Sequence, residues 1–287
     1  PAVKGYRGKP TLVNNTETLC MIPWIINNGN KEFISIGTDG SKGTKVFALA
    51  GKISRGGLIE VPMGITIRQI VEEIGEGVVE DREFKAVQIG GPSGGCIPAS
   101  LSDTPIDFDE LTRLGAMMGS GGLVVLDNTD CMVDMAKYFL TFTHDQSCGK
   151  CTFCRIGTGK MLEILTRFSR GEAKMQELDE LEELCNSVIQ GSLCGLGKTA
   201  PNPVLTSIRY FREEYEAHTR GVCPARKCPD LITYRVNDNC IGCTLCAREC
   251  PVDAIEYRPY EKHEIDIDKC IKCDSCVQVC PSEAIDK

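Results

Sequence analysis

The sequence predicts a multidomain α+β protein, and three regional patterns predict it. Strand and helix signals alternate over residues 44–127, as in a small mixed α+β unit. Apolar residues at helical spacing dominate residues 130–218, which indicates a four-helix bundle. A cysteine run of spacing C-x2-C-x2-C-x3-C-P then occurs twice between residues 240 and 281. We therefore expect the chain to divide into segments 1–43, 44–128, 129–220, 221–235 and 236–287.

Composition restricts the classes of function. The chain has 287 residues, 18 of them cysteine, and a formal net charge of −8. Clustering at metal-ligand spacings favours reduced thiolates in a reducing compartment over disulfides. The negative charge argues against a nucleic-acid partner. No apolar run reaches the ~18 residues of a membrane span, and no signal peptide is visible, so we expect a cytoplasmic protein without a membrane partner. Because the first residue is Pro, we also expect a longer parent chain.

The first segment predicts one helix. An apolar run from Cys20 to Ile26 ends at Asn27-Asn28-Gly29, a helix stop. Paired asparagines, Asn14 and Asn15, precede it and can either cap the helix or bind a ligand. Spacing alone favours capping.

The second segment predicts a small sheet with two helices. One helix begins at a Thr66–Gln69 capping box and ends at Gly75, and the other spans 109–114. The glycine-rich stretch 90–95 lacks the Lys-Ser/Thr end of a phosphate loop, so a hairpin turn is the better interpretation. The predicted strands are Lys45–Gly51, Leu58–Met63, Phe84–Ile89, Cys96–Ala99 and Leu123–Asp127.

The third segment predicts four amphipathic helices that run antiparallel, because their connections are short. Three cysteines at C-x2-C-x2-C lie between the first two helices, and Cys194 follows the third. In an antiparallel bundle both loops lie at the same end, so we expect one [4Fe–4S] cluster on Cys148, Cys151, Cys154 and Cys194. A zinc site on the same thiols is the alternative. The predicted helices are Met132–Thr143, Gly159–Ser169, Gln176–Ile189 and Leu205–Ala217.

The last segment carries the two-cluster bacterial ferredoxin signature, in which the fourth cysteine of each run ligates the other cluster. The alternatives are two zinc knuckles or a disulfide scaffold, and the repeated register closed by Pro disfavours both. We predict one [4Fe–4S] cluster on Cys240, Cys243, Cys246 and Cys280, and another on Cys270, Cys273, Cys276 and Cys250.

Six cysteines remain. We interpret Cys20 and Cys96 as small core residues, and we place His144 and His263 on the surface. His218, Cys223 and Cys228 supply three ligands of a tetrahedral zinc site at the junction before the ferredoxin segment. Among fourth ligands, Cys185 is disfavoured by its ~15–20 Å distance along the helix axis. Cys131, which opens the first bundle helix, is easier geometrically.

Several of these motifs together resemble a known family. The stretch K-P-T-L-V-N-N-T-E-T-L at 9–19 and the loops around Cys148 and Cys194 are similar to the NADH-oxidising flavoprotein subunit of respiratory complex I and its relatives in NAD(P)-linked hydrogenases. With the ferredoxin tail and the stretch 195–203, the chain looks most like the C-terminal part of the beta subunit of electron-bifurcating [FeFe] hydrogenases.

The resemblance implies cofactors and partners. It implies that 44–128 is a soluble-ligand-binding β-grasp domain, that Asn14 and Asn15 lie against FMN, and that 1–43 is the tail of an FMN- and NADH-binding domain. The family's Gly-rich nucleotide motifs precede this stretch and are not in this chain, so we expect the chain alone not to be catalytic. The implied partners are a hydrogenase catalytic subunit, a small [2Fe–2S] subunit and ferredoxin, in a hetero-oligomer.

The function expected from the resemblance is electron transfer. The intact protein would be an oxidoreductase subunit that passes electrons between NAD(H) and FMN, ferredoxin and the hydrogenase subunit through three clusters. The same cassette could serve an NAD(P)-dependent formate dehydrogenase or a complex I-like NADH dehydrogenase. A further alternative is a ferredoxin-docking scaffold with no chemistry of its own.

Overall fold

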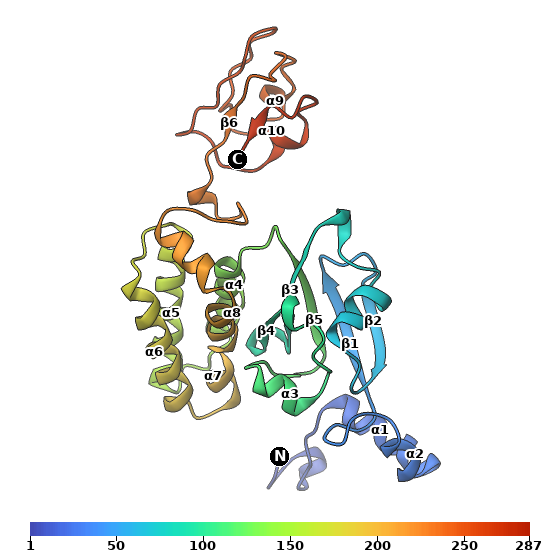
Figure 1. Ribbon diagram of the computed structural model, residues 1–287. Helices are drawn as coiled ribbons and strands as arrows, with labels where there is room; N and C mark the ends of the chain where they lie inside the picture. The colour runs from blue at the N-terminus through green and yellow to red at the C-terminus, as the bar shows by residue number, and fades with distance from the viewer.

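A computed structural model describes the backbone of residues 1–287 and every side chain except that of Asp81. The molecule is a mixed α+β protein with three bodies (Figure 1). A sheet unit and a helical bundle lie side by side, the ferredoxin-like unit stands beyond the bundle, and α1 and α2 lie at the opposite extreme beside β1 and β2. Within the described chain, no helix is long and apolar enough to cross a membrane.

The N-terminal segment rests on the sheet through one polar side chain. Helix α1 (Thr16–Asn28) buries none of its residues and is followed by the short α2 (Asn30–Ile34). Asn15 caps α1, its side chain accepting from the backbone N–H of Glu17 at 2.8 Å. The Glu17 carboxylate pairs with Lys45 and accepts from the N–H of Val46 at 2.7 Å. One ion pair and one hydrogen bond therefore tie α1 to the first strand.

The expected five strands form one mixed sheet in the order β2-β1-β5-β3-β4. The hairpin predicted at 90–95 is present between β3 and β4, β1 pairs antiparallel with β2, and β1 pairs parallel with β5. Thr66 and Gln69 form the predicted reciprocal capping box ahead of a π-helical turn at Gln69–Ile74. The strands are β1 (Thr44–Gly51), β2 (Gly57–Pro62), β3 (Phe84–Ile89), β4 (Gly95–Pro98) and β5 (Gly122–Asp127), and the helix is α3 (Phe108–Arg113).

The glycine-rich stretch between β3 and β4 is a turn, as expected. Gly90 has φ +88°, and a Cβ there would lie 1.9 Å from the carbonyl oxygen of Met117. The close backbone approach explains the glycine without any phosphate. The core of the sheet unit is apolar and includes Phe47, Ile67 and Val87, all fully buried.

Four long helices form the bundle. Helix α4 packs on α5 and α8, and α5 packs on α6. Phe168 and Tyr215 meet edge-on in its core, with ring centroids 5.5 Å apart. The helices are α4 (Met132–Asp145), α5 (Thr152–Ser169), α6 (Gln176–Gly191) and α8 (Asn202–Thr219), with the short α7 (Gly195–Thr199) between the last two.

The bundle corrects one predicted boundary. We expected the second helix to begin at Gly159, but α5 begins at Thr152. Gly157 lies within α5 and faces α6, where a Cβ on it would lie 2.4 Å from Cγ2 of Val188. The glycine is a close-packing position, which sequence cannot distinguish from a helix breaker.

The sheet and the bundle share an interface between β4 and α8. The N–H of Cys96 donates to Oγ1 of Thr206 at 2.9 Å, and the hydroxyl of Tyr210 donates to the carbonyl of Leu114 at 2.9 Å. These bonds join groups about a hundred residues apart.

After α8 the chain crosses to the C-terminal unit through a turn at Pro229–Leu231. Two short strands and two single-turn helices frame that unit, and its core holds Tyr234, Ile255 and Ile285 beside several cysteines. Its elements are β6 (Arg235–Val236), α9 (Leu245–Arg248), α10 (Ser275–Gln278) and β7 (Ile285–Asp286).

Candidate functional site

The first cysteine set meets at one end of the bundle. Cys148 lies in the loop after α4, Cys151 precedes the first residue of α5, Cys154 is in its first turn and Cys194 precedes α7. All four line one cavity of about 90 Å³. The antiparallel helices thus bring together the two loops from which the sequence predicted a shared site.

Small groups shape this cavity. A Cβ on Gly197 would lie 2.5 Å from Oγ of Ser192 and 3.2 Å from Cβ of Cys154. The backbone N–H groups of Gly197 and Leu196 hydrogen-bond to Cys194 and hold the pKa of its thiol below the ordinary value. The N–H groups of the first turn of α7 therefore favour a thiolate here.

The first C-terminal set surrounds Cys246. Burial, and after it electrostatic interaction with the sulfurs of Cys240, Cys243 and Cys280, raises the pKa of Cys246. The structure therefore brings the fourth cysteine of the second run to the first three of the first run.

The second C-terminal set lines one small cavity of about 20 Å³, together with Tyr234 and Ile255. The two halves of the unit are equivalent. The N–H of Ala254 donates to Sγ of Cys250 at 3.2 Å, and the N–H of Ala284 donates to Sγ of Cys280 at 3.2 Å. The cysteines lining the cavity are Cys250, Cys270, Cys273 and Cys276.

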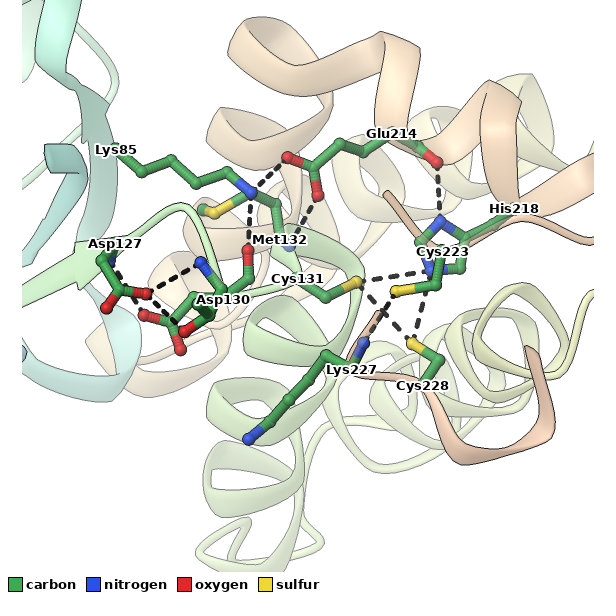
Figure 2. Close-up of polar contacts among 11 residues, drawn as sticks. Lys85, Asp127, Asp130, Cys131, Met132, Glu214, His218, Cys223, Lys227 and Cys228 are labelled. Carbon is green, nitrogen blue, oxygen red and sulfur yellow. Dashed lines mark hydrogen bonds and ion pairs between the residues drawn. The ribbon is translucent and has the colours of Figure 1, made fainter. Parts of the chain in front are cut away.

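A fourth set lies where α4 begins and α8 ends. Sγ of Cys131, Nε2 of His218 and the sulfurs of Cys223 and Cys228 all lie within 4.8 Å of one another, and all four residues are buried. Nε2 of His218 is 3.3 Å from the sulfurs of Cys131 and Cys228, which are 3.7 Å apart (Figure 2). Cys185 belongs instead to the buried core of the bundle.

The four groups of this set act on one another's pKa values. Burial by itself would lower the pKa of His218, but its contacts with Cys131, Cys223 and the nearby thiolate charge raise that pKa to about 10. Hydrogen bonds from the thiols of Cys131 and Cys228 lower the pKa of Cys223. The set therefore places one imidazole against three buried sulfurs (Figure 2).

A second layer of contacts orients these ligands. Nδ1 of His218 lies 2.7 Å from the carbonyl oxygen of Glu214, one turn earlier on α8, which leaves Nε2 directed at the sulfurs. The N–H of Lys227 donates to Sγ of Cys223 at 3.3 Å.

The same Glu214 connects the set to the sheet. Its carboxylate pairs with Lys85 of β3 at 2.6 Å and accepts from the N–H of Met132 at 3.0 Å, next to Cys131. Lys85 also donates to the carbonyl of Asp130 at 2.5 Å (Figure 2). Sequence reasoning missed Lys85 and Glu214, because neither lies in a motif and their only signal is spatial.

The other predicted residues are more scattered. Asn14 and Asn15 are exposed, and both side chains accept from backbone N–H groups of their own segment. Cys20 is exposed, contrary to the prediction that it is a core residue, because no residue of α1 is buried.

Cys96 is buried, as expected. His263 is 1% exposed, contrary to the surface placement, because its segment folds against the Cys240 loop.

Two regions of the chain match known families. Residues 134–218 match the NADH-ubiquinone oxidoreductase-F iron–sulfur binding region, and residues 235–286 match the 4Fe-4S dicluster domain.

Curated relatives cover most of this chain. It is 51% identical over 265 residues to the NADP-reducing hydrogenase subunit HndC of Solidesulfovibrio fructosivorans, covering 92% of this chain and 54% of that protein. It is 41% identical to the F 2 subunit of NADH-quinone oxidoreductase in Rhizobium meliloti (strain 1021), covering 80% of this chain and 53% of that protein. The chain therefore spans about half the length of these relatives.

A solved structure agrees with these relatives. The NAD+-reducing [NiFe]-hydrogenase in its H2-reduced state includes a chain that is 33% identical and superimposes with a TM-score of 0.68, covering 76% of this chain and 37% of that one. This protein is thus homologous to the hydrogenase protein HndC and to the F subunits of NADH-quinone oxidoreductase, and it joins their iron–sulfur binding region to a 4Fe-4S dicluster domain.

Proposed function

We propose that this chain is the iron–sulfur electron-transfer part of an NADH-oxidising subunit in a multi-subunit hydrogenase. The observation that carries the proposal is the convergence of three cysteine quartets, each completed by a cysteine from a distant part of the chain. The homology to HndC supports the hydrogenase assignment.

The bundle quartet fits a [4Fe–4S] cluster held by Cys148, Cys151, Cys154 and Cys194. Oγ of Ser192 lines the cavity, is buried and has no partner within the described chain. A buried hydroxyl without a hydrogen-bond partner lowers the stability of the fold. The Ser192 hydroxyl therefore suits a site where a cluster sulfide would accept its hydrogen bond. The cluster would supply one-electron transfer, and the chain's part is to bind it and to direct N–H and O–H groups at its sulfurs.

The ferredoxin-like unit fits two more clusters, one on Cys240, Cys243, Cys246 and Cys280 and the other on Cys250, Cys270, Cys273 and Cys276. Cys276 packs against the buried cluster that contains Cys246, so the two sets are neighbours. Adjacent sites of this kind can exchange electrons with each other and with an external ferredoxin.

We assign zinc to the fourth set. Tetrahedral zinc, with bonds of about 2.3 Å to sulfur and about 2.0–2.1 Å to nitrogen, places sulfurs about 3.8 Å apart and nitrogen about 3.6 Å from sulfur. The separations of 3.7 Å and 3.3 Å come close to these values. Four protein ligands leave no open position, so the role would be structural, clamping the junction to the ferredoxin arm.

The remaining assignments rest on the resemblance. Residues 44–128 would be the β-grasp domain, 129–220 the cluster-bearing bundle, 221–235 the zinc linker and 236–287 the ferredoxin domain. Residues 1–43 would end a nucleotide-binding domain in which Asn14 and Asn15 contact FMN. The partners would be a hydrogenase catalytic subunit, a small [2Fe–2S] subunit and ferredoxin, in a cytoplasmic, electron-bifurcating complex with NAD(H).

A second candidate is a complex I-like NADH dehydrogenase, which the 41% identity to the Rhizobium F 2 protein favours. Recovery of a quinone-linked membrane partner, with no hydrogenase subunit, in a pull-down of the intact protein would select it. Recovery of a molybdenum formate dehydrogenase subunit in the same pull-down would instead favour a role in an NAD(P)-dependent formate dehydrogenase. A docking scaffold would show no NADH–dye reductase activity in the intact protein.

Metal analysis tests the proposal directly. We expect about twelve iron atoms and one zinc per chain, from three four-iron clusters and one tetrahedral site. Cys194→Ser should lower iron to about eight and remove one reduced-cluster EPR signal. Cys20→Ser, an exposed cysteine outside all four sets, is the matched control and should keep twelve. Colourless anaerobic protein, or a Cys194→Ser protein with unchanged iron and EPR, would refute it.

A further inference from the structure

The ferredoxin-like unit buries one histidine beside one of its cysteines. We infer that His263 donates a hydrogen bond to the Cys240 thiolate and thereby raises the reduction potential of the cluster that Cys240 holds. The inference rests on the proposed function, because it concerns one of the clusters proposed for this unit.

The burial of His263 needs an explanation. The imidazole is 1% exposed, and its Nε2 has no hydrogen-bond partner in the described part of the chain. A unit of about fifty residues has little core with which to offset an unsatisfied polar atom. The contact that this burial does provide is at the other ring nitrogen, Nδ1, which faces a cysteine sulfur of the proposed cluster.

The contact itself is specific. Nδ1 of His263 lies 3.7 Å from Sγ of Cys240, within the range of a hydrogen bond to sulfur. A thiolate that ligates iron carries no hydrogen, so the hydrogen of this contact must be on Nδ1. The ring is then a donor to the ligand sulfur.

One backbone hydrogen bond and one side-chain ion pair hold the segment of His263 in place. The N–H of Tyr260 donates to the carbonyl of Gly242 at 3.0 Å, and Nζ of Lys262 contacts Oδ1 of Asp238 at 2.6 Å. A Cβ on Gly242 would lie 2.6 Å from the backbone N of Glu261, so only glycine allows this approach. The segment carrying His263 is thus fastened to the chain before and after Cys240.

The arrangement treats the two clusters of this unit unequally. The chain has three histidines, and the other two, His144 and His218, belong to the bundle. The thiolates of the second set therefore have no imidazole donor from this chain. Hydrogen bonds to ligand sulfur stabilise the more negative, reduced cluster and raise its potential. The Cys240 cluster should consequently accept an electron at a higher potential than it would without His263.

Potentiometric EPR of the intact, cluster-loaded protein tests the inference. His263→Leu removes the donor at similar volume, and His263→Asn restores an amide donor near the position of Nδ1. We expect Leu to disfavour reduction of one ferredoxin-unit cluster by about tenfold, which is about 59 mV for one electron, and Asn to recover most of that loss. His144→Leu is the matched control and should leave both clusters of this unit unchanged. Equal potentials in wild type and His263→Leu, or an equal loss in both variants, would overturn the inference.

A second measurement does not depend on the folding of any variant. In wild-type protein labelled with 15N-histidine, pulsed EPR of the reduced ferredoxin unit should show a 15N coupling to one cluster only. Absence of that coupling, with both clusters present, would overturn the inference and leave the proposed function intact. Absence of both cluster signals would overturn the proposed function and the inference together.

Discussion

Cys131 and His218 are 87 positions apart in the chain, yet Sγ of Cys131 lies 3.3 Å from Nε2 of His218. Cys131 is the N-cap residue of α4 and His218 lies in the last turn of α8. The contact therefore joins the start of one helix to the end of the other. Glu214 fixes both partners, through its carbonyl to His218 and its carboxylate to the N–H next to Cys131. The geometry of the set therefore depends on the packing of α4 against α8.

Removal of the imidazole should empty this site. We expect His218→Ala to lose the single zinc while keeping about twelve iron atoms, because no cluster uses this residue. Elemental analysis of purified protein measures both metals. Cys185→Ala, at a buried cysteine of the same bundle outside the set, should keep its zinc. Full zinc in His218→Ala would exclude the assignment.

The ion pair between Lys85 and Glu214 should behave as a buried unit. Either Lys85→Met or Glu214→Leu leaves one charge unpaired beneath the sheet–bundle interface, so each single variant should lose about 3 kcal/mol of unfolding free energy. The double variant should be more stable than the sum of both losses implies. Urea titrations of the four proteins complete the cycle. Strict additivity would mean that the pair contributes no coupling.

Two glycines of α5 offer a matched test of helix packing. Gly157→Ala places a Cβ 2.4 Å from Cγ2 of Val188 and should cost about 1–3 kcal/mol, because α5 and α6 must separate. Gly159→Ala meets only Cε1 of His144 at 3.4 Å, so its effect should be neutral or stabilising by up to about 1 kcal/mol. Thermal unfolding compares the two. A neutral Gly157→Ala would show that the helices are not in close contact there.

The cap of α3 gives a prediction about pH. Asp107 accepts hydrogen bonds from the Thr38 hydroxyl and from the N–H of Asp109 at 2.9 Å. The Thr38 bond, partly opposed by burial, lowers the pKa of Asp107. A lowered folded-state pKa gives stability that is fully present above the ordinary value of about 3.9 and is lost as pH falls through the folded value.

The cost of Asp107→Ala should therefore be constant, at about 1–2 kcal/mol, from pH 5.5 to pH 8. The free energy of unfolding at both pH values measures it. Asp109→Asn changes an exposed neighbouring acid and should stay within about 0.5 kcal/mol of wild type. A cost that grew between pH 5.5 and pH 8 would contradict the lowered pKa.

The fold class and the three thiol quartets could be predicted from sequence because their determinants are local or repeated. Three ligands of each quartet fall within seven residues, so one loop presents them together. The fourth follows from symmetry in the ferredoxin-like unit, where Cys250 and Cys280 hold equivalent positions, and from antiparallel topology in the bundle. The strands and long helices likewise follow from apolar spacing.

Tertiary structure alone decided what depends on packing between distant segments. The sequence left the fourth zinc ligand open between Cys131 and other residues. It gave no sign of Lys85 and Glu214, because Glu214 accepts its hydrogen bond from an N–H that is 82 positions away in the chain. It also misplaced His263, whose burial comes from the chain folding back on the Cys240 loop. Ligand type and local spacing are encoded along the chain, whereas which distant groups surround a ligand is set by how the helices and loops close-pack.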